Sequence, residues 1–129
     1  MSYTIDRIFQ NTEFETIVAR TRTALADQGF GVLTEIDVKA TMKKKINEDM
    51  DNYLILGACN PKLAFGAIGV EPKVGAMLPC NVIVRSLANG DVEVSAVDPQ
   101  ASMTGIENSE LAQVAGEVKG MLETVVGNV

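Results

Sequence analysis

Two cysteines, each followed directly by an asparagine, are the residues of this chain best suited to chemistry. Cys59 stands in the run Leu-Gly-Ala-Cys-Asn-Pro, and Cys80 stands in the run Leu-Pro-Cys-Asn. Thiolates act as nucleophiles and bind soft metal ions, and an asparagine amide both donates and accepts hydrogen bonds. The sequence therefore predicts a thiol-containing site with four central residues: Cys59, Asn60, Cys80 and Asn81.

Cys59 directly precedes a predicted helix over residues 61–70. Asn60 is a favoured N-cap residue, and Pro61 suits the first helical position because its missing N–H is not needed there. The N-terminus of a helix carries about half a positive charge. This position favours the thiolate form of Cys59 over the thiol.

The sequence leaves open whether the two thiols meet. Cys59 ends a predicted strand over 53–58, and Cys80 opens the next, over 81–87. If these strands are adjacent and antiparallel, both thiols lie at the same end of the sheet; if they are parallel, the thiols lie at opposite ends. Free cysteine is also among the most buried residue types, so two inert core cysteines are a further interpretation.

Three hypotheses for the function follow. The first is a binding protein that holds a soft metal ion or a small ligand in this site, with three weaker polar candidates: Glu35, Asp37 and Asp98. Two thiolates alone underfill a zinc site, which normally has four ligands, so no residue is assigned as a dedicated metal ligand. The second is a redox or sulfur-carrier protein in which Cys59 is the nucleophile and Cys80 the resolving thiol. The third is a protein that functions through association. Cofactor and catalytic residues remain unassigned.

Composition narrows the class of protein. The 129 residues carry a net charge of −6 and no basic block, which predicts a single domain over 1–129 that does not bind nucleic acid. No run is long enough to cross a bilayer, and the N-terminus does not resemble a signal peptide, so we expect a cytoplasmic protein with reduced thiols. The absence of histidine excludes imidazole catalysis and imidazole metal ligands within one chain.

The elements that position the site are predicted to alternate as β-α-β-(short α)-β-α-β-β-α. Long helices are expected over 13–28 and from Asn108 or Ser109 to Gly127, with a short helix capped by Asp37. A capping box of Thr12 and Glu15 is expected at the start of the first long helix, and Gly29 is placed to cap its end. The order predicts an α+β two-layer sandwich: a mixed or mostly antiparallel sheet of about five strands with helices packed on one face. The helix over 61–70 is apolar all round, which predicts that it is buried. Gly66 in its middle predicts close backbone packing there, because glycine otherwise destabilises a helix.

A turn at Asn89-Gly90 predicts a hairpin between the last two strands. A two-residue turn pairs Ser86 with Glu93 and Val84 with Ser95. In this register the sheet face that carries Val84 is half apolar, which is too hydrophobic for ordinary exposure to solvent. We therefore expect a partner subunit to cover that face, in a homodimer.

Several runs together resemble a bacterial and archaeal family called domain of unknown function 302. The runs lie at 28–32, 35–39, 56–61, 78–82 and 94–99. The resemblance spans nearly the whole chain, and the Cys-Asn-Pro and Leu-Pro-Cys-Asn signatures make it specific. It implies a small α+β protein that forms dimers. Family members often carry His or Tyr where this chain has Phe65, so members that use a histidine there are no guide to its chemistry.

Overall fold

The computed structural model describes residues 2–129. In chain order its elements are β1 (Thr4–Phe9), α1 (Phe14–Asp27), β2 (Gly31–Asp37), α2 (Val38–Ile46), β3 (Tyr53–Cys59), α3 (Pro61–Val70), the 3-10 helix η1 (Pro72–Met77), β4 (Cys80–Ser86), β5 (Val92–Val97), α4 (Pro99–Ser102) and α5 (Ser109–Asn128).

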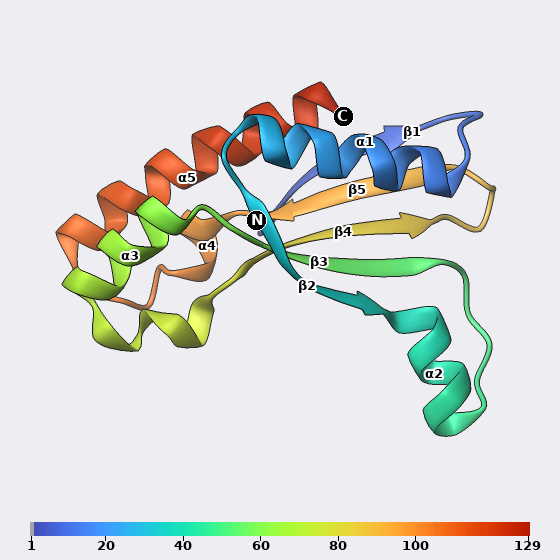
Figure 1. Cartoon of the computed structure of the whole chain (residues 1–129), viewed down its shortest axis with the longest axis horizontal. Coiled ribbons are helices and arrows are strands. Elements are labelled where there is room, and N and C mark those ends of the chain that lie inside the picture. The colour runs from blue at the N-terminus through green and yellow to red at the C-terminus, as the bar shows by residue number, and fades with distance from the viewer. Residues whose placement is uncertain (1) are drawn as a thin grey trace.

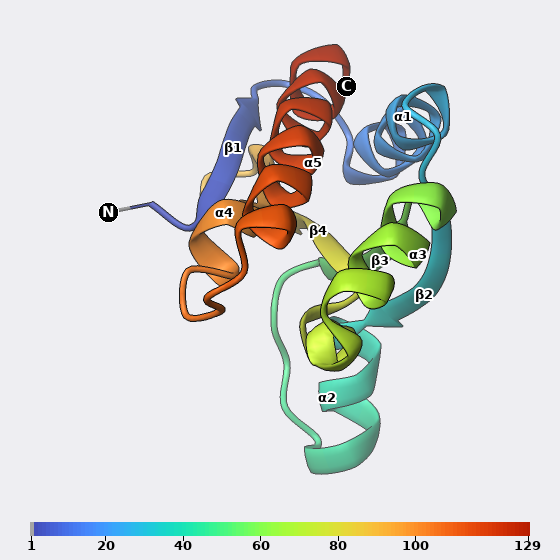
Figure 2. The ribbon, with the colours of Figure 1, turned by 90° about the vertical axis from the view of Figure 1, so that its left-hand side faces the viewer.

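The five strands form one sheet in the order β1-β5-β4-β3-β2. Every neighbouring pair is antiparallel. Helices α1 and α5 pack together on one face of the sheet, whereas α2 projects away on the opposite side (Figures 1 and 2). This arrangement confirms the predicted α+β sandwich with its long helices on one face.

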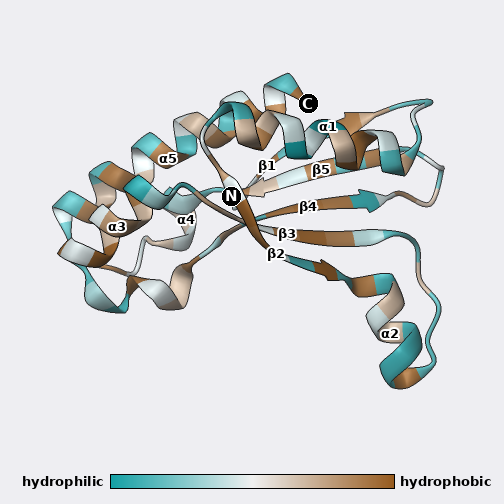
Figure 3. Cartoon of the chain, in the orientation of Figure 1, coloured by the Kyte–Doolittle hydropathy of each residue, from teal (hydrophilic) through white to brown (hydrophobic). Residues whose placement is uncertain are grey.

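The main core lies between the sheet and the helices α1 and α5. Side chains from the middle strands, such as Leu56, Val82 and Val94, are fully buried against Ile17 of α1 and Leu122 of α5. Hydrophobic colour runs along β3 and β4 for this reason (Figure 3). A smaller cluster of buried side chains joins α3, η1 and the start of α5 at the end of the sheet where β3 ends.

Local signals explain the main helix ends. At the end of α1, Gly29 adopts φ +80°, and the N–H of Phe30 donates to the carbonyl of Leu25 at 3.0 Å, which is the predicted glycine C-cap. The capping box predicted at Thr12 is wrong: the N-cap is Glu13, and the Thr12 hydroxyl donates to the carbonyl of Gln10.

The predicted register of the β4–β5 hairpin is wrong by one residue. Val84 pairs with Val94, and Ser86 pairs with Val92. The loop has three residues rather than two, and Gly90 at φ +92° takes the left-handed position that closes a three-residue loop. Because a shift of one residue turns every side chain to the other face, Val84 belongs to the core and not to a half-apolar outer face.

The sheet face opposite α1 and α5 is nevertheless partly apolar. We call it the open face. It carries Ile8 and Ile36, which are 53% and 47% exposed, and the half-buried Ile55 and Ile83. Arg85 and Glu93 pair across β4 and β5 on the same face at 2.7 Å. The sheet therefore does have a partly hydrophobic second face, but the residues that form it differ from those predicted.

Helix α3 is not buried as its composition predicted. Phe65 is 84% exposed and Ile68 is 46% exposed, and only Ala67 is buried. Apart from its own helix, no atom lies within 4 Å of a Cβ placed on Gly66, so the close packing against another backbone that was expected there is absent. Helix α3 lies over the end of the sheet and leaves one side exposed to solvent. Because its sequence is apolar on every side, the sequence alone does not indicate which side packs against the rest of the protein.

Gly57 is the glycine whose missing side chain the fold requires. A Cβ there would overlap the hydroxyl of Thr34 and would lie 2.8 Å from the ring of Pro79. Gly57→Ala should therefore lower the free energy of unfolding by about 2 to 3 kcal/mol. Gly66→Ala is the matched control, and it should raise stability by about 0.5 to 1 kcal/mol because Gly66 lies in open space within a helix. Urea denaturation of both variants measures the difference, and equal stabilities would contradict the packing described here.

Candidate functional site

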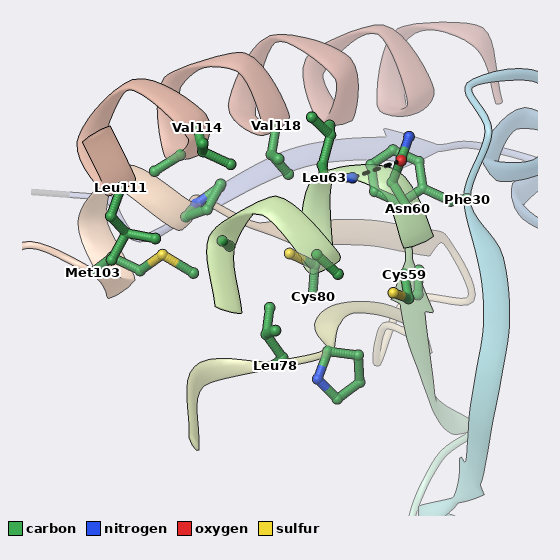
Figure 4. Close-up of a pocket in the computed structure, with 16 residues that line it drawn as sticks. Phe30, Cys59, Asn60, Leu63, Leu78, Cys80, Met103, Leu111, Val114 and Val118 are labelled. Atoms are coloured by element: carbon green, nitrogen blue, oxygen red, sulfur yellow. Dashed lines mark hydrogen bonds between the residues drawn. The ribbon is translucent and has the colours of Figure 1, made fainter. Parts of the chain in front are cut away.

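The two cysteines lie at the same end of the sheet. Strands β3 and β4 are adjacent and antiparallel, and Ala58 lies directly opposite Cys80. Cys59 is the next residue after Ala58, at the point where β3 leads into α3. Of the two alternatives that the sequence left open, the structure has the antiparallel one: both cysteines lie at one end of the sheet, and both are among the residues that line a cavity beneath α3 (Figure 4).

The cavity is small and apolar. Sixteen residues line it, from the ends of β3 and β4, from α3 and from the chain around α4 and α5, and none of them carries a charge. Asn60 is the only polar side chain among them besides the two thiols. The cavity volume is about 40 Å³. Pockets for organic ligands usually measure about 300 to 1,000 Å³, so this cavity fits an ion or a group of a few atoms.

Asn60 is engaged in forming the helix start. Its side-chain oxygen accepts a hydrogen bond from the N–H of Leu63 at 3.3 Å, and Pro61 follows at the first helical position. This confirms the predicted cap. The interaction fixes the N-terminus of α3 directly after Cys59, so the partial positive charge of the helix end lies beside that thiol.

The two thiols differ in their surroundings. Both are free, but Cys59 is half-buried at the edge of the cavity, whereas Cys80 is only 7% exposed. Burial raises the pKa of Cys80 from 9.0 to about 11, and the charge of Cys59 adds to the shift. A negative charge on Cys59 therefore disfavours the ionisation of Cys80.

The raised pKa of Cys80 predicts a loss of stability at alkaline pH. The thiol keeps its proton in the folded chain up to about pH 11 and loses it in the unfolded chain above pH 9.0. The stability that the protonated Cys80 thiol contributes is thus fully present below pH 9.0. As pH rises through about 11, the free energy of unfolding falls by about 2 to 3 kcal/mol. Urea denaturation between about pH 8 and about pH 11 should show this extra loss in the wild type and not in Cys80→Ala, which has no thiol to titrate. Parallel pH profiles for the two proteins would contradict it.

The other predicted site residues are not part of this cavity. Asn81 is exposed on the open face of β4, opposite Gly57. Glu35 lies on edge strand β2, where its carboxylate pairs with Arg22 of α1 at 2.6 Å. Asp37 is the N-cap of α2 and accepts a hydrogen bond from the N–H of Ala40 at 2.9 Å. Glu35 and Asp37 share a second, polar cleft beside α1.

Asp98 supports the cavity indirectly. It caps α4 by accepting hydrogen bonds from the N–H groups of Gln100 and Ala101 at 2.9 and 3.3 Å, and it pairs with Lys119 of α5 at 3.1 Å. Burial opposes its ionisation, but the hydrogen bond from Lys119 and the backbone donors outweigh burial and lower the pKa of the carboxyl. Helix α4 ends just before Met103, a cavity residue that the sequence analysis missed.

Comparison with known proteins decides the family. A family model described as domain of unknown function DUF302 matches residues 7–129. The chain belongs to the DUF302 family. A crystal structure of an uncharacterized conserved DUF302 protein from Bacillus stearothermophilus has the same fold, with a TM-score of 0.92 at 22% identity, over 99% of this chain and 98% of that one. No curated protein matches this DUF302 chain.

Within residues 2–129, no helix has the length and hydrophobicity needed to cross a membrane. In the same range, no three His, Cys, Asp or Glu side chains gather where they would hold a metal ion. The thiol pair is therefore not accompanied by the further nitrogen, oxygen or thiolate ligands of a structural zinc site.

Proposed function

We propose that this DUF302 protein binds a soft metal ion between the thiolates of Cys59 and Cys80. The observation that carries the proposal is that two free thiols share one small apolar cavity with no charged side chain in its walls. Thiolates are soft ligands, and soft ions such as Cu(I) prefer them to oxygen ligands. The two free thiols also fit a reducing compartment, and we place the protein in the cytoplasm on that ground.

The size of the cavity favours an ion over an organic ligand. A volume of about 40 Å³ is several times smaller than the pockets of organic ligands. The apolar walls offer few oxygen ligands, so they offer little to a hard cation such as Mg²⁺, which prefers them. A soft ion that gives up its water for sulfur fits both properties of the cavity.

Thiol redox chemistry between Cys59 and Cys80 is supported less well. The half-buried Cys59 at the cavity edge is placed to attack an incoming disulfide, as the second hypothesis requires. Cys80 would then have to attack as a thiolate, the reactive form of a thiol. With a pKa of about 11, only about one Cys80 in 10,000 is ionised at pH 7. It is therefore a slow resolving thiol.

We also propose that two copies associate through the open face. Five strands spaced by about 4.8 Å, with about six residues each at about 3.3 Å, cover about 24 by 20 Å. Two such faces bury about 1,000 Å² in total, which is close to the smallest area of a stable interface. The isoleucines at 8, 36, 55 and 83 supply the apolar contact, and the Arg85–Glu93 pair supplies a polar one.

Native mass spectrometry of protein purified without chelator tests both parts of the proposal. We expect a dimer whose extra mass corresponds to one metal ion per chain and disappears on unfolding. Extra mass that survives unfolding on a Cys59 or Cys80 peptide would favour covalent thiol chemistry instead. A bare protein that takes up no Cu(I) added under anaerobic conditions would overturn the metal site, and a monomer at micromolar concentration would overturn the dimer.

A further inference from the structure

Helix α2 buries none of its nine residues in the single chain. Met42 and Ile46 lie one turn apart on the same side of the helix and are 36% and 62% exposed. A helix shorter than about 12 residues is marginal in water unless tertiary packing covers its apolar side. Asp37 and the left-handed Asn47 define the two ends of α2, but within the chain its apolar side lacks such cover.

The position of α2 relates it to the opposite edge of the sheet. It follows the edge strand β2 and projects on the side of the open face (Figures 1 and 2). Ile8 lies on the open face of β1, the other edge strand, and is 53% exposed. Strand pairing places it in one row across the sheet with Glu93, Arg85 and Tyr53, the residue that begins β3. Asp37, the last residue of β2, lies at this end as well, so α2 and Ile8 stand at opposite edges but at the same end of the strands.

We infer that α2 is an arm that packs against Ile8 of a second copy in the open-face dimer. The inference rests on the proposed dimer and specifies its symmetry. Consider a twofold axis that runs along the strands, midway between two facing open faces. It preserves the strand direction and places each edge of one sheet opposite the other edge of the partner sheet. Each α2 is then brought to the partner's Ile8, twice in one dimer.

The dimensions of α2 fit this arrangement. Sheets that pack face to face lie about 10 Å apart. With nine residues, α2 is about 13 Å long and about 10 Å wide, so it spans the gap to the partner's edge strand. Two such arms, together with the surfaces that they cover, add about 500 Å² to the open faces. The interface then buries about 1,500 Å² in total, which is the usual size of a stable interface and not its lower limit.

The charges beside the two contact points have opposite signs. Lys44 and Lys45 directly precede Ile46 on α2. Asp6 lies two residues before Ile8 on the same face of β1, and Glu93 lies directly opposite Ile8 on β5. Opposite charges at the rim of an interface favour the register that brings them together over registers that oppose like charges.

New charges at the two contact points test the inference. Ile8→Lys places an ammonium group beside the lysines of the partner's α2, and Ile46→Glu places a carboxylate against the partner's apolar surface. Each should raise the dissociation constant of the dimer by about tenfold or more. The double variant brings the ammonium opposite the carboxylate and should recover most of the wild-type affinity. Both positions are exposed in the single chain, so all three variants should fold, and sedimentation velocity over a range of concentrations measures the dissociation constants.

Hydrogen exchange at α2 gives a second readout. The amides of the short helix should exchange at least about tenfold more slowly in the wild-type dimer than in the Ile83→Lys monomer, because only the dimer covers the apolar side of α2. Equal exchange of these amides in the two proteins would overturn the role of α2 as an arm.

Leu33 provides the control for the direction of the axis. It is 66% exposed at the irregularity of β2, and a twofold axis across the strands would bring α2 to the partner's β2 instead of its β1. Recovery of Ile46→Glu by Leu33→Lys and not by Ile8→Lys would therefore overturn the inferred axis. Single variants that dimerise as the wild type does, or a double variant as weak as the single ones, would overturn the contact between α2 and Ile8 and leave the proposed dimer intact. A monomeric wild type would overturn the proposed dimer itself.

Discussion

Cys80→Ser is expected to weaken the binding of Cu(I) by about a thousandfold or more. The hydroxyl of serine is close to the thiol in shape, so the cavity keeps its form, but its oxygen is a hard ligand that Cu(I) disfavours. Cys59 is then left as the only thiol among the residues that line the cavity. A ligand held in place acts at a millimolar or higher effective concentration, and its loss removes that advantage.

Competition with a Cu(I) chelator measures this change directly. Cys59→Ser should show a loss of similar size, because each variant leaves one thiolate. Ser95→Ala is a suitable control. Ser95 is a buried polar residue outside the cavity, and the substitution removes only its hydroxyl oxygen. Wild-type affinity in either cysteine variant would contradict the proposed site, whereas a matching loss in Ser95→Ala would show that the assay reports folding and not ligation.

Replacing Ile83 by lysine is expected to convert the dimer to a monomer. Ile83 lies at the middle of the open face, on the central strand, with Ile55 on one side and Ser95 on the other. An ammonium group buried between two apolar faces costs several kcal/mol, which raises the dissociation constant at least a hundredfold. In the monomer the lysine reaches solvent, so the fold itself should lose little stability.

Sedimentation velocity at micromolar concentration distinguishes the two states. Ile68→Lys is the matched control, because it places the same charge on the exposed side of α3, away from the open face. We expect Ile68→Lys to remain a dimer. If the Ile83→Lys variant is a dimer and the Ile68→Lys variant is a monomer, the interface lies on α3, where Phe65 is also exposed, and not on the open face.

Capping residues and the two cysteine signatures made much of the architecture predictable from sequence. Asn60 and Pro61 located the start of α3, and Gly29 located the end of α1, because both signals act within a few residues. Both cysteines line the cavity, but their position at the same end of the sheet depended on strand order, which is a long-range property.

The features that the sequence analysis missed depend on contacts between distant segments or on small local differences. The Asn89-Gly90 turn is compatible with loops of two or three residues, and only the observed pairing of Ser86 with Val92 decides between them. The exposure of Phe65 depends on which side of α3 meets α5. Met103 lies in a stretch without periodicity, so its place in the cavity appears only once α4 has packed on α5.

Titration of reduced protein with Cu(I) under anaerobic conditions tests the central claim most directly. Aliquots are added in the presence of a competing chelator, and the wild type is compared with the double variant Cys59→Ser, Cys80→Ser. We predict a sharp endpoint at one Cu(I) per chain in the wild type and no uptake by the double variant. Either no endpoint in the wild type or the same endpoint in both proteins would contradict a metal site at Cys59 and Cys80.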